Sequence, residues 1–391
     1  MRGRGVLILV ENLSVPFDRR VWLEARALKE NGFTVSVICP RFKKEKSLEA
    51  LEGINIYRYS QPPATGGVLS YILEFSYCLI MTFLLSVRVF FRHNFDIIHA
   101  CNPPDTFFLI GIFYKAFGRK FYYDQHDLCP EVYLAKYGEH KKDFLYRALL
   151  LLEYLTYKTA DRVIVTNNSY RDIAVSRGRL KPDKVFVVRT GPDTARFKNI
   201  SSKEGLKGDK KFLVAYLGVM APQDGVDYLL MAIDILVNKY KRDDITFSLI
   251  GSGDSIHDLK RLREELSLNN SVVFTGRVPD EELFSYLASS DICVAPDPRN
   301  QLNDKSTMNK ILEYMAMAKP IVSFDLKEAR YSAGDAALYA APNNIQDFAD
   351  KIIELLQDPE RRARMGKIGY ERLKGELSWD YNKKRLTDVY S

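Results

Sequence analysis

Short apolar runs alternate with longer helix-like segments along the first half of the chain. The apolar runs are rich in Val, Ile, Phe and Tyr and are bounded by Gly, Pro, Asn or Asp, which is typical of buried strands. They predict strands at 6–10, 34–39, 54–59, 96–100, 120–124, 162–166 and 185–189. Segments of helical length lie between them, near 18–31, 68–92, 106–117, 141–159 and 169–178. Strands that alternate with helices predict βαβ units and a parallel sheet covered by helices on both faces.

The same alternation restarts after 191–208, a stretch with Gly, Pro, Ser and Lys and no long apolar run. Strands are predicted at 212–217, 246–250, 272–275, 292–295, 321–324 and 337–340, and helices near 225–240, 255–267, 280–289, 307–317, 345–357 and 359–373. A chain of 391 residues also suits two domains better than one. We therefore predict an α/β chain with two doubly wound, Rossmann-like domains.

The predicted domains are 1–198 and 199–376, with a cleft between them, and a helix over 377–391 that crosses back onto the first domain. In doubly wound sheets, ligands bind at the carboxyl ends of the strands, so the cleft is the expected place for a substrate. Two stacked domains that share no site are the alternative.

Charge is distributed unevenly between the two halves. The net charge is +7, but the first 200 residues hold 30 Lys and Arg against 20 Asp and Glu, whereas the rest hold 27 against 30. A basic first half favours anionic lipid head groups or phosphate-bearing acceptors as partners. We expect no nucleic acid partner, because the sequence has no helix-turn-helix, zinc-finger or RRM signature.

Cysteines and apolar segments indicate the cellular compartment of the protein. The five scattered cysteines form no C-x-x-C pair, which argues for a reducing compartment and against a zinc site. No signal peptide is evident. The segment 68–91 has the length of a spanning helix but carries Glu74 and Arg88. We expect a cytoplasmic protein whose long helix lies near a bilayer, peripheral on the inner face of the cell membrane; a true membrane span is the alternative.

The segment NDKSTMNKILEYMAMAKP, residues 303–320, predicts an anion-binding helix start. Asp304, Ser306 or Thr307 can cap this helix, whose free amides and positive dipole end would accept a diphosphate. Glu313 lies in its apolar part, where a carboxylate needs a partner, and ribose hydroxyls are suitable donors. The alternative is an ion pair between Glu313 and Lys310 with no ligand.

Motifs along nearly the whole chain resemble one known family. LEYMAMAKPIVSFD after a strand, Pro296 and a polar loop is similar to the donor-site signature of the retaining GT-B glycosyltransferases of family 4, also called group 1. FTVSVICP, DIIHA and YYDQHD resemble the family in the first half, and FLVAYLG, LIGSGD, VVFTGRVPDEEL and GELSWD in the second. The resemblance implies the GT-B fold and a nucleoside-diphosphate sugar as donor, with UDP expected first, GDP second, and no cofactor.

The resemblance also implies donor contacts. Glu313 corresponds to the family's ribose-binding glutamate, and Arg277 and Val278 to the segment whose backbone reads the nucleobase. Gly218 and Gly251 correspond to glycines that approach the donor closely. The start of the predicted helix adds the remaining expected donor contacts: Lys305, Ser306, Thr307, Met308, Asn309 and Lys310.

The sequence departs from the family where the diphosphate should bind. The segment 218–225, GVMAPQDG, lacks the usual Arg and Lys, and Lys305 stands where the family has a second carboxylate. The glycine pair of the first domain is absent as well. We hypothesise that Lys305 and Lys310, with Arg19 or Arg20 from the first domain, replace the missing cations. For Arg19 and Arg20, surface charge at a helix start is the alternative.

His126 is the expected catalytic residue. It corresponds to the family's histidine near the reacting centre, and neighbouring acids such as Asp127 could raise its pKa. A hydrogen-bonding role at a strand end is the alternative. His99 is a second histidine for the acceptor side, although a structural role competes. No D-x-D triplet occurs, so we expect no metal.

These features predict a hexosyltransferase-type enzyme. The resemblance implies transfer with retention and no covalent intermediate, to a glycan or polyprenyl-linked acceptor in surface polysaccharide or glycolipid synthesis. Two alternatives remain: a non-catalytic scaffold of the same fold, favoured by the missing cations, and a sugar-nucleotide epimerase.

Overall fold

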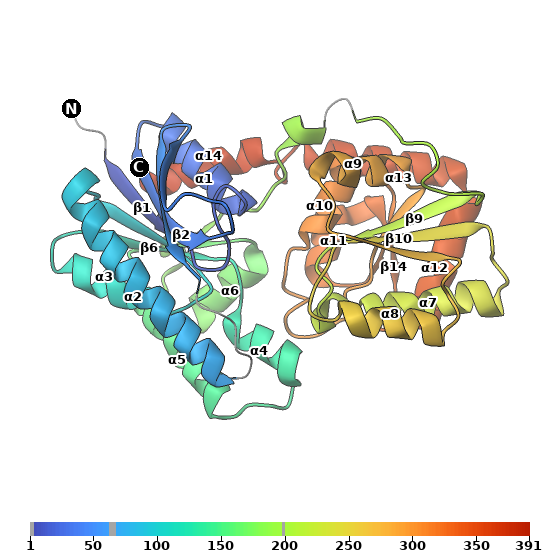
Figure 1. Cartoon of the computed structure of the whole chain (residues 1–391), viewed down its shortest axis with the longest axis horizontal. Coiled ribbons are helices and arrows are strands. Elements are labelled where there is room, and N and C mark those ends of the chain that lie inside the picture. Colours follow the sequence, from blue (N-terminus) through green and yellow to red (C-terminus); the bar gives the residue numbers. More distant parts are fainter. Residues whose placement is uncertain (1–3, 62–67, 198–199) are drawn as a thin grey trace. The chain divides into compact units, whose positions relative to one another are not determined.

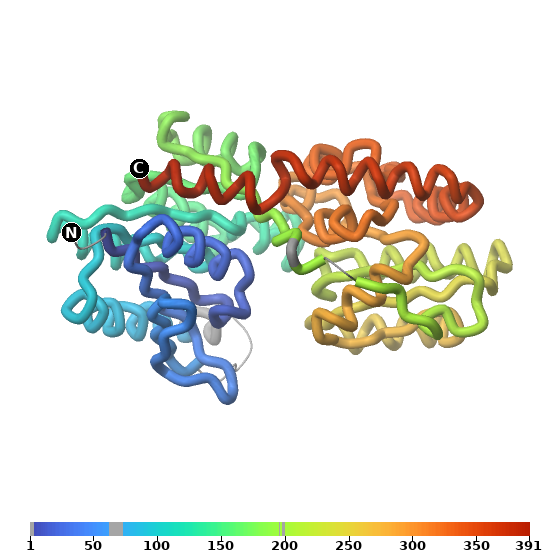
Figure 2. The backbone as a smooth tube through the Cα atoms, turned by 90° about the horizontal axis from the view of Figure 1, so that it is seen from above, coloured from blue at the N-terminus to red at the C-terminus, as the bar shows by residue number. Residues whose placement is uncertain are grey.

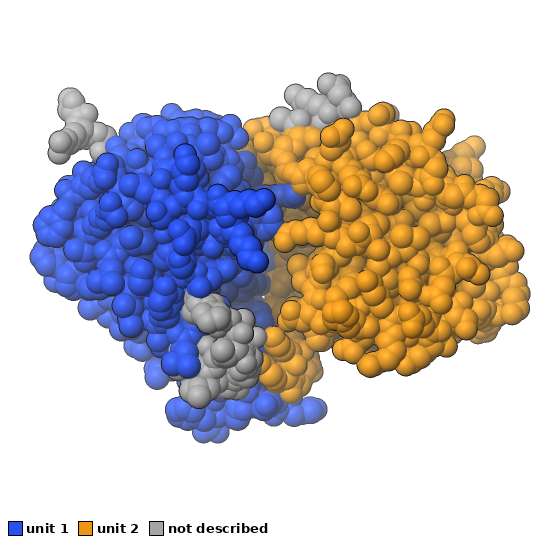
Figure 3. Space-filling view, viewed as in Figure 1, with its two compact units in different colours: residues 1–134, 140–189, 383–391 blue, residues 135–139, 190–382 orange. Residues whose placement is uncertain are grey.

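The protein divides into two compact units, each built on one sheet. The structure, a computed structural model, describes residues 4–61, 68–197 and 200–391. The first unit comprises 1–134, 140–189 and 383–391, and the second comprises 135–139 and 190–382 (Figures 1 and 3). Apart from the short stretch 135–139, the chain thus changes unit at 189/190 and again at 382/383. The predicted boundary at 198/199 lies outside the described residues.

The first unit holds an eight-stranded sheet. Its strands are β1 (Gly5–Leu9), β2 (Thr34–Arg41), β3 (Leu48–Leu51), β4 (Ile54–Ser60), β5 (Ile97–Cys101), β6 (Lys120–Gln125), β7 (Arg162–Val165) and β8 (Val185–Val187). They are ordered β3-β4-β2-β1-β5-β6-β7-β8, and all pair in parallel except β3 with β4. Every strand predicted in this half is confirmed. The edge strand β3 was missed because its four side chains are largely exposed and give no buried apolar run.

Helices cover both faces of this sheet. They are α1 (Arg19–Glu30), α2 (Val68–His93), α3 (Phe108–Lys115), α4 (Cys129–Tyr137), α5 (Phe144–Thr159) and α6 (Asn168–Ser176). Figure 1 shows α1 on one face of the sheet and α2, α3 and α5 on the other. The helix α4 was not predicted, because its polar and apolar positions follow no clear helical period.

The second unit holds a six-stranded, fully parallel sheet of order β11-β10-β9-β12-β13-β14. Its strands are β9 (Phe212–Leu217), β10 (Ile245–Ile250), β11 (Val272–Gly276), β12 (Ile292–Ala295), β13 (Ile321–Phe324) and β14 (Ala337–Ala340). Its helices are α7 (Val226–Asp234), α8 (Ile256–Glu265), α9 (Asp280–Ser289), α10 (Asn309–Ala316), α11 (Lys327–Ala333), α12 (Ile345–Gln357) and α13 (Pro359–Leu373). The six predicted strands are confirmed, and α11 was not predicted.

The last helix, α14 (Trp379–Tyr390), ends in the first unit. Lys383 pairs with Glu30 of α1, and the ring of Tyr390 packs against Phe33 and Tyr122. Figure 2 shows this helix as the red end of the tube. The prediction that the C-terminal helix crosses back onto the first domain is therefore confirmed, and the crossing adds Tyr390 to the core of that unit.

Both sheets reverse their strand order beside their first strand, which is where doubly wound folds bind ligands. In the first unit β1 lies between β2 and β5, and in the second β9 lies between β10 and β12. Gly251, which follows β10 with φ +134°, is needed here, because a Cβ would collide with the carbonyl oxygen of Gly218 after β9. The carboxyl ends of these two strands are thereby held close together.

Candidate functional site

A buried charge cluster lies at the carboxyl end of the first sheet, and Arg20 is its centre. The Arg20 side chain is 6% exposed, and its Nη2 lies 2.8 Å from Asp124 Oδ1 and 3.0 Å from Glu24 Oε1. Its Nη1 donates to the carbonyl of Val188 at 3.0 Å. Burial lowers the pKa of Arg20, but the two carboxylates outweigh burial and raise it. The surface-charge alternative is therefore wrong for Arg20, whereas Arg19 is exposed.

His126 follows β6 and joins this cluster through one nitrogen. Its Nε2 lies 2.6 Å from Asp124 Oδ2, and its side chain is 17% exposed. Burial lowers the pKa of His126, but the Asp124 carboxylate outweighs burial and raises the pKa well above its usual range. The same interaction, together with Arg20, holds the pKa of Asp124 well below its usual range against the effect of burial. The Asp124 carboxylate beside the ring thus favours the protonated form of His126.

Two donors compete at His126 Nε2. Arg20 Nε lies 3.0 Å from this nitrogen and 3.3 Å from Asp124 Oδ2. A protonated Nε2 donates, so it cannot also accept from Arg20, and the shorter contact with Asp124 prevails. Arg20 Nε is then directed at Asp124. The Cys101 side chain is a further hydrogen-bonding neighbour of the His126 ring.

Asn102 fixes the loop that carries His126, and sequence reasoning missed it. Its Oδ1 accepts from the backbone N–H groups of His126 and Asp127, at 2.6 and 3.1 Å. Its Nδ2 donates to Asp105 Oδ1 and to the carbonyl of Asp127. Burial raises the pKa of Asp127. Asn102 directly follows β5, which lies next to β6, the strand that precedes His126. A side-chain amide at that strand end was the feature of the sequence that could have identified Asn102.

His99 is fully buried and does not line a surface. Its Nε2 lies 3.3 Å from Asp124 Oδ2, and its Nδ1 forms a short hydrogen bond with the hydroxyl of Tyr390. Burial lowers the pKa of His99, but its neighbours, Tyr390 first, outweigh burial and raise it. The geometry supports the structural alternative for His99. It also adds Tyr390, whose part the sequence did not show.

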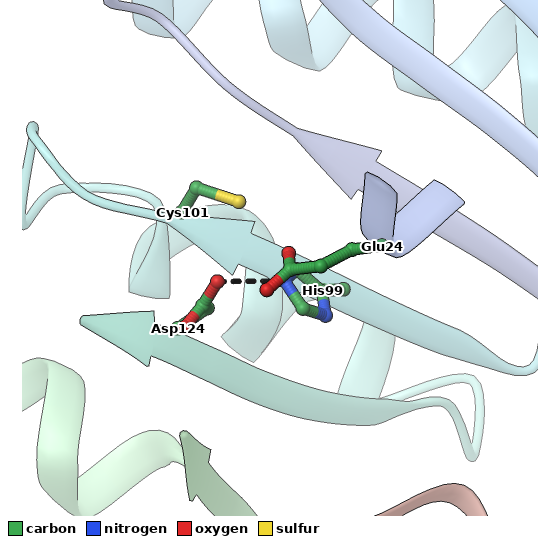
Figure 4. A group of neighbouring side chains, drawn as sticks. All are labelled: Glu24, His99, Cys101 and Asp124. Carbon is green, nitrogen blue, oxygen red and sulfur yellow. Dashed lines mark hydrogen bonds and ion pairs between the residues drawn. The ribbon is translucent and has the colours of Figure 1, made fainter. Parts of the chain in front are cut away.

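Four of these side chains have the composition of a metal site. One ligand atom each from Glu24, His99, Cys101 and Asp124 lies within 4.8 Å of the others (Figure 4). Arg20, however, already contacts both carboxylates. A divalent ion here would have to compete with a guanidinium that neutralises the same oxygens. The group is therefore best described as a charge network that holds Asp124 and, through it, His126.

A second buried cluster lies at the carboxyl end of the second sheet, around Lys310. Its Nζ lies 2.7 Å from Asp297 Oδ1, 3.9 Å from Asp224 Oδ1 and 4.9 Å from the ring centre of Tyr216. Burial lowers the pKa of Lys310, but the two aspartates outweigh burial and raise it. Burial raises the pKa of Asp224 to about 6. The alternative of an ion pair between Lys310 and Glu313 is wrong: Asp297, which sequence reasoning missed, is the partner of Lys310.

The helix start differs from the prediction. The helix α10 begins at Asn309, with Met308 at its N-cap and no side-chain cap. Asp304 instead accepts from the backbone of Lys327, and the Ser306 hydroxyl donates to the carbonyl of Leu302. Asp304 and Ser306, two of the predicted caps, thus form other hydrogen bonds, and both belong to a turn at 301–306.

The predicted donor residues gather at one edge of the second sheet. A Cβ at Gly218 would lie 2.7 Å from the Tyr216 hydroxyl and 3.2 Å from Lys310 Cε, so this glycine permits close approach beside the lysine. Arg277 is exposed and Val278 half-buried just after β11. On and before α10, Asn309 is exposed, and the half-buried residues are Lys305, Ser306, Thr307, Met308 and Glu313.

A hollow of about 220 Å³ lies elsewhere in this unit, between α7 and α8. Its lining includes Ala221, Val226, Asp227 and Asp258, and none of the predicted donor residues. We therefore keep the donor prediction at the Lys310 edge.

Two protein families match the chain over consecutive stretches. The family described as Glycosyltransferase Family 4 matches residues 18–196, and the family described as Glycosyl transferases group 1 matches residues 211–358. The first match contains His126 and its cluster, and the second contains Lys310, Asp297 and Glu313.

Individual relatives are more distant. A GDP-mannose-dependent monoacylated alpha-(1-6)-phosphatidylinositol monomannoside mannosyltransferase from Corynebacterium glutamicum is 29% identical over 53% of this chain and 54% of its own. The alpha-D-kanosaminyltransferase of Streptomyces kanamyceticus is 29% identical over 44% of this chain and 42% of its own. The chain thus spans about half the length of the curated relatives it matches.

Solved structures agree over the full length. Sucrose-phosphate synthase from Thermosynechococcus elongatus superposes with a TM-score of 0.78 over 99% of this chain and 98% of that chain, at 17% identity. WaaG, a glycosyltransferase involved in lipopolysaccharide biosynthesis, gives 0.74 over 98% and 99%, at 14% identity. At such identities the likeness concerns the fold, and it confirms the predicted GT-B architecture.

Proposed function

Because the chain belongs to the group 1 glycosyltransferases of family 4, we propose that it transfers a hexose from a nucleoside-diphosphate sugar to an acceptor hydroxyl with retention. The bond between the anomeric carbon and the phosphate oxygen breaks, and a bond to the acceptor oxygen forms. The acceptor's proton passes to the leaving diphosphate. No metal or cofactor is assigned a part.

The observation that carries this proposal is the position of His126, whose Nε2 lies 2.6 Å from the buried carboxylate of Asp124. A neighbouring carboxylate favours the protonated imidazole, which is less suited to act as a base and better suited to donate a hydrogen bond. We assign this donor to the transferred sugar or to the acceptor hydroxyl, which it positions for attack. Asp124 holds the ring in place, and Arg20 in turn holds Asp124.

The second unit is assigned the nucleotide. Glu313 binds the ribose hydroxyls, the segment at Arg277 and Val278 reads the base, and the amides at the start of α10 approach the diphosphate. UDP is proposed before GDP, and both have precedent: HepE of Anabaena was solved with UDP-glucose, and the corynebacterial relative is named as GDP-mannose-dependent.

The acceptor is proposed to be a glycan or a lipid-linked glycan. The support is indirect: one relative is named for phosphatidylinositol mannosides and a structural neighbour for lipopolysaccharide biosynthesis. The basic first half of the chain agrees with a phosphate-bearing acceptor.

The test is a panel of UDP- and GDP-sugars, followed by turnover with lipid-linked acceptors. For His126→Ala we expect turnover to fall about 100-fold or more, because a positioned proton-bearing group typically contributes that much, with donor affinity nearly unchanged. Full turnover in this variant contradicts the role of His126. Conversion of the donor without acceptor would favour the epimerase, and no donor binding at all would favour the scaffold.

A further inference from the structure

The long helix α2 presents its large apolar side chains outward. Its buried positions are Cys78, Thr82, Ser86 and Val89, spaced three or four residues apart, so one mostly small and partly polar stripe faces the sheet. The opposite stripe carries Ile80 at 58% exposed, Leu84 at 56% and Phe91 at 84%. A surface helix of a globular protein normally shows the reverse pattern, with its apolar stripe inside.

One hydrogen bond to α3 and packing along the sheet hold α2 in this orientation. The Ser86 hydroxyl lies 3.0 Å from the hydroxyl of Tyr114 on α3 and donates to the carbonyl of Phe83. The inner side of the helix packs along β1, β2 and β4. The small and hydroxyl-bearing side chains of α2 therefore pack inward, and its large apolar side chains face outward.

Two neighbouring helices extend the same apolar surface. Phe83 and Phe90 of α2 pack against Phe113 and Phe117 beside them, with ring centres 5.0 and 6.2 Å apart, and α3 packs against α5. Figure 1 shows the three helices on one face of the sheet. Their exposed apolar side chains are Leu73, Ile80, Leu84, Phe91, Leu109, Ile112, Phe113, Phe117, Phe144 and Leu151, which we call the apolar face.

Lysine and arginine outnumber acidic residues on the segments that carry the apolar face. The segments 73–93, 108–120 and 141–160 contain nine Lys and Arg against three Asp and Glu, one of which, Glu153, is buried. The exposed cations are Arg88, Arg92, Lys115, Lys120, Lys141, Lys142, Arg147 and Lys158. Interfacial membrane binding has two components. Apolar side chains enter the bilayer surface, and cations beside them contact anionic head groups.

We propose that the apolar face docks on an anionic lipid bilayer, with α2 lying in the plane of the membrane surface. Of the described helices, only α2, over Leu73–His93, is long and apolar enough to cross a membrane by length and composition. Crossing would strip its inner stripe from three strands and expose the Ser86–Tyr114 pair to lipid, whereas docking keeps both. The in-plane arrangement also lets α3 and α5 contribute.

The test is sedimentation of the full chain with vesicles of phosphatidylcholine containing 30% phosphatidylglycerol, compared with pure phosphatidylcholine. We expect binding to the anionic vesicles that weakens as salt is raised. The variant Ile80→Ser/Leu84→Ser/Phe91→Ser should bind at least about tenfold more weakly, because three apolar side chains no longer enter the lipid. The matched control Val273→Ser/Ile368→Ser alters exposed apolar residues of the second unit and should bind as the parent does.

Three outcomes would overturn the proposal. One is equal binding of the triple variant and the parent, with thermal unfolding showing that both are folded. Another is no binding to either vesicle, with self-association that the triple variant abolishes, which would make the apolar face an interface between copies of this chain. The third is retention in membranes after washing at high pH, which would indicate a spanning helix. Lipid binding needs no sugar donor, so its failure is distinguishable from failure of the proposed transfer.

Discussion

The two units each bury a cluster of charged side chains at the same end of their sheets, but the balance of charge differs. In the first unit Arg20, His99 and His126 meet the two carboxylates of Glu24 and Asp124. In the second, Lys310 alone meets Asp297 and Asp224.

The difference decides which groups keep their protons. An excess of cations holds the pKa of Asp124 below its usual range, whereas an excess of carboxylates leaves Asp224, whose burial dominates, with a pKa of about 6. The carboxylates of the first cluster are therefore paired with cations of the same cluster. The second carries a carboxylate whose charge opposes an anionic donor, and that charge disappears as the pH falls below about 6.

The largest expected effect comes from removing Asp124. Asp124→Asn leaves Arg20 buried without one of its two carboxylates, and breaking a buried ion pair costs about 3–5 kcal/mol of unfolding free energy. It should also lower the pKa of His126, because the carboxylate that raises that pKa is gone. Denaturant unfolding and NMR titration of the imidazole measure the two effects.

Glu24→Gln is the matched control for Asp124→Asn. Glu24 also contacts Arg20 but does not contact His126, so stability should fall while the pKa of His126 stays high. An unchanged pKa of His126 in Asp124→Asn would show that the cluster does not govern the proton of His126.

The stability that Asp124 contributes depends on pH with a defined sign. Since the pKa of folded Asp124 is lowered, its contribution to stability is present above the usual aspartate pKa and is lost as the pH falls further.

Asp224→Asn should act in the opposite direction. The pKa of folded Asp224 is raised from 3.8 to about 6, so the carboxyl contributes stability below about pH 4 that is lost as the pH rises through 6. Removing the charge should raise the unfolding free energy by up to about 3 kcal/mol at pH 7.5 and change it little at pH 4. Denaturant unfolding at both pH values checks this. A variant that is less stable than the parent at pH 7.5 would contradict the charge imbalance.

Lys310→Ala should weaken donor binding about tenfold, which corresponds to about 1.4 kcal/mol, because two aspartates are left without their cation beside the predicted diphosphate. Calorimetric titration with a UDP-sugar measures the dissociation constant. Lys327→Ala, an exposed lysine at the start of α11, is the matched control and should bind normally. Unchanged binding in Lys310→Ala would remove this lysine from the hypothesised replacement of the phosphate cations.

Tyr390→Phe is the smallest change. It deletes the hydroxyl that bonds to His99 Nδ1 while keeping the ring in the core, so we expect a loss of about 1 kcal/mol. The pKa of His99 should fall, since Tyr390 contributes to raising it. Tyr370→Phe, at an exposed position of the second unit, should leave both stability and the imidazole titration as they are. An unaltered pKa of His99 in Tyr390→Phe would show that the Tyr390 hydroxyl of the C-terminal helix does not influence the charge cluster.

The sequence by itself determined most of the elements and their order. Buried parallel strands leave near-continuous apolar runs, which is why both series of strands could be predicted, and an exposed edge such as β3 leaves none. The resemblance to family 4 gave the architecture and singled out His126 and Glu313. It also showed that the usual phosphate cations are missing.

Only the tertiary structure decided the partners. Arg20 and Asp124 are 104 residues apart, His99 and Tyr390 291, and Lys310 and Asp297 13, with a turn between them. A pattern along the chain cannot report such pairs, because burial and charge act through space. The same holds for α2: its apolarity was visible in the sequence, but small and hydroxyl side chains packing against the sheet decided that its large side chains face outward.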